Sequence, residues 1–325
     1  MAFISAQHMN AVKTSGVAHG GRLAAYGAIP SRWWYGWAIS GGWLVLRRWH
    51  LVGFVLSAAL VLACEGTATP QPGPTGTAKS GLPSSMAALG DSITAGFGTC
   101  LTLVACTRNS WSTGGSAAVD SHYRRIRDDN AAMKGNARNY AVPGARAKSL
   151  AGQADQAVRA KVQYVTVLIG ANDACAGRVQ DMTATATFRK QVDTALARLK
   201  KGLPKARVLV VSIPDLYRLW QLGHDNDRAV RAWNDGVCQS LLANPTSTAE
   251  ADDNRRKQVD DRVDAYNRAL AAACEKYGKR CKWDGGSVHG VRFSLDLVNE
   301  IDYFHPDVEG QNELADATYP GRFTW

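Results

Sequence analysis

The chain has 325 residues, 46% of them hydrophobic, which is enough for a sizeable core and argues against wholesale disorder. Its formal net charge is +10, but the first 64 residues hold five Lys and Arg and no Asp or Glu. The other 33 Lys and Arg face 28 Asp and Glu, a net charge of +5. No basic stripe with interleaved aromatic residues is present, so the sequence does not predict nucleic-acid binding.

The N-terminal segment has the pattern of an export signal. Arg47 and Arg48 precede an apolar run at residues 51–63, and Cys64 follows. A run of this length rises only about 20 Å as a helix, too little to span a bilayer comfortably. We therefore predict a leader and signal peptide at residues 1–63. A buried core helix is the alternative interpretation of the apolar run.

The four residues that end at Cys64, Val-Leu-Ala-Cys, resemble a bacterial lipoprotein cleavage box, in which Cys64 becomes the lipidated first residue. Secretion without a lipid is the alternative. Residues 64–84 are rich in Pro, Gly, Thr and Ser, a composition that suits a flexible tether. We expect an extracellular monomer, secreted or lipid-anchored to the outer face of the cell membrane, with its folded domain at residues 85–325. Its only membrane contact would be this possible anchor.

Apolar runs and helical spacings alternate through the rest of the chain. Nearly continuous, β-branched runs are typical of buried strands, and apolar residues at helical spacing predict helices. Strands are predicted at residues 86–89, 138–142, 162–169 and 207–213, with a fifth from Lys282 onward. Helices are predicted at residues 111–127, 185–200, 259–278 and 310–317, and a polar surface loop at residues 246–258. This alternation implies a parallel sheet with helices on both faces.

Seven cysteines are present, and setting Cys64 apart leaves six. An even number in an exported chain predicts three disulfides, for which many connectivities are possible. Pairing neighbours in order is the simplest and gives Cys100–Cys106, Cys175–Cys238 and Cys274–Cys281. No Cys-x-x-Cys motif is present, and we expect no metal and no cofactor.

Polar motifs follow the predicted strands. Gly90-Asp91-Ser92-Ile93 follows the first, Pro143-Gly144 the second and Gly170-Ala171-Asn172-Asp173 the third. Asp302-Tyr303-Phe304-His305-Pro306 lies near the C-terminus. In a parallel sheet, ligands bind at the carboxyl ends of the strands, so these motifs are predicted to meet in one crevice.

Together these motifs contain the groups that acyl transfer requires. Ser92 is the candidate nucleophile and His305 the candidate base. Asp302, three residues earlier on one predicted helical turn, can orient the imidazole and stabilise its protonated form. The candidate oxyanion donors are the backbone N–H groups of Ser92 and Gly144 and the side-chain amide of Asn172.

Other polar and aromatic residues have simpler interpretations. Asp91 and Asp173 are expected to stabilise their loops by hydrogen bonds to the backbone. Three further histidines are interpreted as surface or structural residues: His122, His224 and His289. An aromatic and apolar group after the fourth strand either lines an acyl pocket or packs in the core: Leu216, Tyr217, Trp220 and Trp233.

The four motifs, in this order, resemble the blocks of the SGNH, or GDSL-type, serine esterase and lipase family over residues 86–317. The resemblance implies a three-layer α/β/α sandwich with a central five-stranded parallel sheet, the flavodoxin-like SGNH hydrolase fold. It also implies hydrolysis of carboxylic esters and an exported member of the actinobacterial type. The segments IGANDAC and SIPDLY are similar to phospholipase B-type members. Ala171 stands where the family commonly has glycine.

The sequence therefore predicts an exported serine ester hydrolase that acts on a small-molecule or lipid ester. A carbohydrate acetylesterase with the same residues is one alternative, and a non-catalytic binding protein on this fold is another. The G-x-S-x-G motif of the ordinary α/β-hydrolases is absent.

Overall fold

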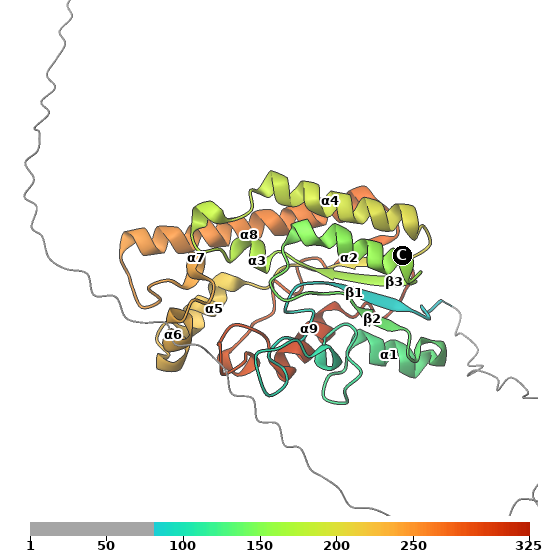
Figure 1. The fold of residues 1–325 in the computed structure, drawn as a ribbon, viewed down its shortest axis with the longest axis horizontal. Coiled ribbons are helices and arrows are strands. Elements are labelled where there is room, and N and C mark those ends of the chain that lie inside the picture. The colour runs from blue at the N-terminus through green and yellow to red at the C-terminus, as the bar shows by residue number, and fades with distance from the viewer. Residues whose placement is uncertain (1–80) are drawn as a thin grey trace, which may run out of the picture. The chain divides into compact units, whose positions relative to one another are not determined.

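The centre of the fold is a five-stranded sheet, seen in a computed structural model that describes residues 81–325 (Figure 1). The predicted leader, Cys64 and the tether as far as residue 80 lie outside the described residues. All neighbouring strands are parallel, in the order β2-β1-β3-β4-β5. The strands are β1 (Met86–Gly90), β2 (Ala137–Asn139), β3 (Tyr164–Leu168), β4 (Arg207–Val210) and β5 (Cys281–Trp283).

Two interior strands, β1 and β3, are buried along their whole length. Met86 of β1 lies beside Tyr164 of β3, and the register continues to Gly90 beside Leu168. A strand covered on both faces must be apolar or small at every position, which explains their nearly continuous hydrophobic sequences. The edge strands β2 and β5 are short and have no fully buried residue.

Helices cover both faces of the sheet (Figure 1). One face carries α2 (Ala147–Arg159), α4 (Thr185–Gly202) and α8 (Glu250–Tyr277), and the other carries α1 (His122–Asp129) and α9 (Val308–Thr318). The predicted three-layer α/β/α sandwich is confirmed. The remaining helices are α3 (Ala171–Ala174), α5 (Leu216–Gly223), α6 (Asp227–Asn234), α7 (Gln239–Leu242) and the short 3-10 helices Thr107–Asn109, Ala131–Met133, Val179–Asp181 and Leu295–Leu297.

The predicted helix at residues 111–127 is wrong over its first part, because α1 begins only at His122. Residues 111–121 form turns that are held by long-range hydrogen bonds. The backbone N–H of Trp111 donates to Oε1 of Gln311 at 2.8 Å. The Ser112 hydroxyl lies 2.7 Å from the hydroxyl of Thr166 in β3. These tertiary contacts override the local helical spacing.

The predicted surface loop at residues 246–258 is wrong over residues 250–258, since α8 begins at Glu250. Arg256 within it is fully buried. Its guanidinium donates to the Ser247 carbonyl at 2.7 Å, pairs with Asp253 and lies 4.2 Å from the centroid of a Trp220 ring. An arginine with such partners can lie in the interior, which a polar sequence alone does not reveal.

Three strands are shorter than predicted, and one of them is β3, which spans Tyr164–Leu168 where residues 162–169 were predicted. β2 ends at Asn139, whose Oδ1 accepts the N–H of Ala141, whereas the prediction extended to residue 142. β4 ends at Val210, and the following Ser212 donates its N–H and its hydroxyl to Asp284. At Ser212 the Asp284 side chain replaces the neighbouring strand, whereas beyond Asn139 the backbone N–H groups of Tyr140 and Val142 still donate to the carbonyls of β1.

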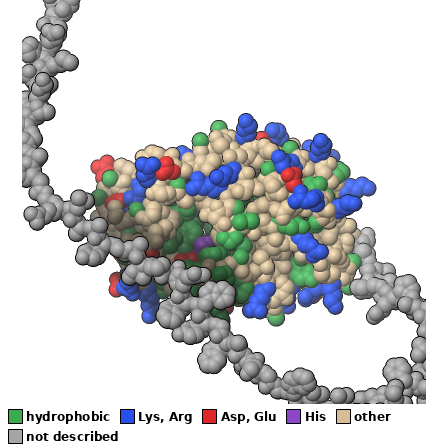
Figure 2. Space-filling view, in the orientation of Figure 1, with side chains coloured by type: hydrophobic (Ala, Val, Ile, Leu, Met, Phe, Trp, Pro, Cys, Tyr) green, Lys and Arg blue, Asp and Glu red, His purple; other side chains and the backbone are tan. Residues whose placement is uncertain are grey.

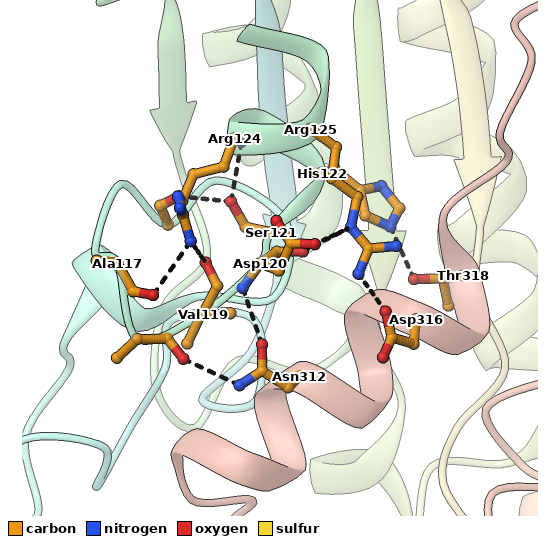
Figure 3. A network of polar contacts seen from close by, with 12 residues as sticks. Ala117, Val119, Asp120, Ser121, His122, Arg124, Arg125, Asn312, Asp316 and Thr318 are labelled. Carbon is orange, nitrogen blue, oxygen red and sulfur yellow. Dashed lines mark hydrogen bonds and ion pairs between the residues drawn. The ribbon is translucent and has the colours of Figure 1, made fainter. Parts of the chain in front are cut away.

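The helices α1 and α9 are joined to each other by a polar network (Figure 3). Asn312 of α9 accepts the N–H of Asp120 at 2.8 Å and donates to the Ala118 carbonyl at 2.9 Å. Arg125 of α1 donates to the Asp120 carbonyl at 2.8 Å and pairs with Asp316 of α9. The network fixes the C-terminal helix against the segment that precedes α1.

His122 lies at the buried end of this network and is fully inaccessible. One ring nitrogen is 3.0 Å from the Tyr164 hydroxyl and the other is 2.9 Å from the Thr318 hydroxyl. Burial, together with the nearby charge of Arg125, lowers the pKa of His122 to about 3. The ring is therefore neutral in the folded protein, and the residue is structural as predicted.

We predict that His122→Gln makes stability less sensitive to acid. The unfolded chain binds a proton on this histidine near pH 6.5, whereas the folded protein does so only near pH 3. Between these values the unfolded state holds more protons, so stability falls as the pH falls. Between pH 6.5 and pH 5 the wild type should lose about 2 kcal/mol more than the variant. Guanidinium unfolding at both pH values measures this, and equal losses would contradict it.

Candidate active site

The loop after β1 presents Ser92. The buried side chain of Gln153, from α2, accepts the N–H of Gly90 at 2.7 Å and donates to its carbonyl at 2.9 Å. Gly90 has φ +154°, and a Cβ there would lie 2.2 Å from the Leu168 carbonyl oxygen. Beyond the serine, Gln311 of α9 donates to the Ile93 carbonyl at 2.9 Å. Ser92 is thus held between two buried amides.

Three predicted residues form a continuous chain of hydrogen bonds. Nε2 of His305 lies 2.9 Å from Oγ of Ser92, and Nδ1 lies 2.7 Å from Oδ2 of Asp302. The other oxygen of Asp302 accepts the backbone N–H groups of Phe304 and His305 at 2.9 and 3.1 Å. The carboxylate is buried, with its side chain 8% exposed, and the imidazole is 16% exposed. The acceptor Asp302 fixes the ring with its other nitrogen facing the serine hydroxyl.

The prediction that Asp302 and His305 share a helical turn is wrong. They lie in a turn in which Tyr303 has φ +49°, and α9 begins later, at Val308. The Tyr303 carbonyl accepts the indole N–H of Trp233 at 3.1 Å. Asn299 donates its backbone N–H to the His305 carbonyl at 2.8 Å and its side-chain amide to the Gly98 carbonyl. The turn is therefore tied to the loop after Ser92.

The predicted oxyanion donors lie on the two neighbouring loops. Gly144 has φ +77°, which favours glycine. The side-chain amide of Asn172 donates to the Ala145 carbonyl at 3.2 Å, which joins the loops after β2 and β3. An amide NH₂ has two hydrogens, so a second N–H is available for a substrate oxygen.

The two aspartates beside these residues hold their loops, as predicted. Asp91 accepts the N–H of Ile93 at 3.0 Å, and Asp173 accepts the N–H of Ala147 at 2.8 Å. Burial raises the pKa of Asp91 to about 7 and also raises the pKa of Asp173. Electrostatic repulsion between the two carboxylates also contributes to the raised pKa of Asp91.

Comparison with known proteins identifies the family of the chain. Residues 86–318, well over half of the chain, match the family model of the GDSL-like lipases and acylhydrolases. The chain belongs to this family. It is a carboxylic ester hydrolase with the SGNH fold. No curated protein matches the chain.

Solved structures with a similar fold include three bacterial hydrolases. A GDSL-like lipase from Parabacteroides merdae has a TM-score of 0.46 and 16% identity, and the match covers 72% of this chain and 92% of the other. An acetylxylan esterase from Geobacillus stearothermophilus has a TM-score of 0.43 and 14% identity, and the match covers 72% of this chain and 91% of the esterase. An extracellular lipase from Streptomyces rimosus has a TM-score of 0.39 and 18% identity, and the match covers 72% of this chain and 97% of the lipase. None of these likenesses is strong enough to bear on the substrate.

The loops of the candidate site are also held by residues that the sequence motifs do not include: Gln153, Gln311, Trp233 and Asn299. A signal for the two glutamines exists. Gln311 shares a helical face with Leu314 and Ala315, and Gln153 shares one with Leu150 and Ala157. A polar residue on the buried face of a helix needs a polar partner in the core. The indole of Trp233 and the amide of Asn299 carry no such signal.

An apolar slot borders the esterase site. It is narrow, with a cavity volume of about 30 Å³. We define it by its lining residues, which are Ile93, residues 214–216, Leu219, Phe293, Val298, Phe304 and Pro306. Of the aromatic and apolar group after β4, Leu216 lines the slot. Trp220 packs on Arg256 and Trp233 is fully buried, so for these two residues core packing is the correct interpretation.

The large hydrophobic residues that are exposed in the described part all lie on loops around the site. Figure 2 shows hydrophobic side chains gathered around a hollow in which a histidine is visible. The exposed residues are Leu101, Leu103 and Val104 between two cysteines, Val142 before the Pro143-Gly144 turn, and Ile301 beside Asp302.

No helix within residues 81–325 is long and apolar enough to cross a membrane, and no cluster of three or more potential metal-binding side chains occurs there.

Three disulfides are present in the structure, in the pairing that the sequence analysis proposed: Cys100–Cys106, Cys175–Cys238 and Cys274–Cys281. The second begins directly after α3, which carries Asn172. Ser240, close to its other end, donates to the Ala174 carbonyl at 2.7 Å. The bridge and this hydrogen bond fasten the loop of Asn172 to α7.

We predict that removing the bridge Cys175–Cys238 costs more stability than removing Cys100–Cys106. The two bridges close sequence separations of 63 and 6 residues, and the entropy of the unfolded chain grows with loop length. Paired Cys→Ser substitutions should lower the free energy of unfolding by about 4 kcal/mol for the first and about 2 kcal/mol for the second. Guanidinium titration measures both, and a larger loss for the short loop would be the contrary result.

Proposed function

We propose that this esterase works through an acyl-enzyme on Ser92. The observation that carries the proposal is the chain of hydrogen bonds from Ser92 through His305 to Asp302. Oγ of Ser92 forms a bond to the ester carbonyl carbon while its proton passes to Nε2 of His305. Asp302 holds the imidazole in the required tautomer and stabilises the imidazolium.

The tetrahedral intermediate places a negative charge on the former carbonyl oxygen. We assign its stabilisation to the N–H groups of Ser92 and Gly144 and the amide of Asn172. His305 then gives its proton to the departing alcohol as the carbon–oxygen bond breaks. Water adds to the acyl-enzyme, gives a proton to His305 and releases the acid, and the proton returns to Oγ of Ser92.

The substrate that we propose is a carboxylic ester with an apolar part, either a small molecule or a lipid. The apolar slot beside Ser92 and the exposed hydrophobic residues around the site support it, because both favour a partly water-insoluble ligand. We also propose that the hydrolase domain of residues 85–325 acts outside the cell as a monomer, tethered by a lipid on Cys64 or secreted. Three disulfides support an oxidising compartment.

The first test is Ser92→Ala in the full chain, with Ser149→Ala on the exposed side of α2 as the matched control. We expect the first variant to lose p-nitrophenyl acetate hydrolysis by at least about 10³-fold and the control to keep it. A fluorophosphonate probe should label the wild type on Ser92 alone, as read by peptide mass. Hydrolysis that survives in Ser92→Ala, or a label on another residue, would refute the assignment.

A second prediction concerns Asp302. Asp302→Asn should reduce kcat by roughly 10³- to 10⁴-fold, because the amide favours the tautomer whose Nε2 carries a proton and cannot accept one. Asp296→Asn, in an exposed 3-10 helix of the same region, is the control and should keep the wild-type rate. Steady-state kinetics with a soluble ester measure both. A loss of less than about 10-fold in Asp302→Asn would contradict the orienting role.

A further inference from the structure

The apolar slot begins one residue from the proposed nucleophile. Ile93, which follows Ser92, forms one wall, and Phe304 and Pro306, which flank His305, form another. The helix α5 contributes Leu216 and Leu219 to the lining, and the two residues before it contribute Pro214 and Asp215. A substituent on a carbonyl carbon held at Ser92 therefore meets apolar side chains at once.

The lining of the slot offers little to a polar ligand. Asp215 is its only polar side chain, and Oδ1 of Asp215 already accepts the N–H of Arg218 at the start of α5. A sugar ring in this space would lose its hydrogen bonds to water without gaining replacements, which is costly. An alkyl chain has no such requirement and gains from the burial of each methylene.

We propose that the slot binds the acyl chain of the ester and that Leu219 sets the chain length. This inference rests on Ser92 as the nucleophile. The acyl chain, and not the alcohol, fits because it stays covalently attached after the alcohol has left. Water must then reach the carbonyl carbon from the side of His305 that the alcohol vacated, which requires that side to be open. The enclosed side is free to hold the chain that remains.

The wall that carries Leu219 has two anchors outside the catalytic loops. The next residue, Trp220, lies with its ring 4.2 Å from the guanidinium carbon of Arg256 in α8. Its indole N–H donates to the Pro245 carbonyl at 2.8 Å. Leu219 itself is 6% exposed, so its side chain has a defined position in the wall. A substitution there changes the shape of the slot while these two anchors stay in place.

The test is Leu219→Trp in the full chain, with Leu222→Trp as the matched control. Both leucines lie on α5, but Leu222 does not line the slot. The readout is the ratio of kcat/KM for p-nitrophenyl butanoate to that for the acetate. Burial of one methylene changes binding about fourfold, so the two additional methylenes are worth about 15-fold. Leu219→Trp should reduce the ratio by about that factor, and Leu222→Trp should leave it at the wild-type value.

A second variant keeps the proposal testable if the tryptophan disturbs folding. Leu219→Ala widens the slot and should raise kcat/KM for the branched 3-methylbutanoate relative to the linear butanoate. An unchanged ratio in both variants would overturn the proposal. So would a ratio that follows the length of the alcohol, in a series of alkyl acetates, and not the length of the acyl chain. Loss of acetate hydrolysis in Ser92→Ala establishes the proposed function separately, so the two failures are distinguishable.

Discussion

The hydrogen bond between Ser92 and His305 joins residues 213 positions apart, and much of the domain is arranged to keep it short. On the serine side, Gln153 binds both polar groups of Gly90, and Gln311 binds the Ile93 carbonyl. Gln311 belongs to α9, which begins just after the turn that carries the histidine. The helix α9 therefore holds the loop of Ser92 through Gln311, and its first residue lies three positions after His305. A small movement of α9 would shift both partners together, which preserves their distance better than two independent supports could.

Burial is the second constraint on the site. Asp91 lies next to the proposed nucleophile with a pKa raised to about 7, and Asp173 behind Asn172 is also shifted upward by burial. Near neutral pH Asp91 is thus partly uncharged. A second full negative charge beside the oxyanion would oppose the reaction, because charges in a site with little water interact strongly. Asp302 lies on the other side of the imidazole, with its Oδ2 2.7 Å from Nδ1 of His305. The buried aspartates hold the loops by accepting N–H groups, and burial disfavours the charged form of both carboxyl groups.

The sequence predicts the sheet and the meeting of its motifs because both follow from local patterns. The β-branched run that ends at Leu168 forms β3, and the polar motifs appear at the carboxyl ends as expected for parallel strands. The failures occur where distant partners decide the structure. Residues 111–121 are not helical because Trp111 and Ser112 bond to α9 and β3, and Arg256 is buried because Trp220, Ser247 and Asp253 surround it. No pattern within a window of the sequence contains these partners. The turn of Asp302 and His305 is a mixed case: the three-residue spacing places the carboxylate correctly, but the backbone achieves it without a helix.

Catalysis and chain-length selection are assigned to different segments of the fold. The proposed reacting groups come from the loops after β1, β2 and β3 and from the turn before α9. Six of the nine residues that line the slot come from α5, from the two residues before it and from the segment after β5, and the other three are Ile93, Phe304 and Pro306. The helix α5 is anchored to α8 through Trp220 and Arg256, and none of these contacts involves Ser92 or His305. Substitutions on α5 can therefore change the space beside the carbonyl carbon without moving the hydrogen-bonded chain. In this proposal the wall on α5 selects the chain length, while Gln153 and α9 hold the loop that carries the proposed nucleophile.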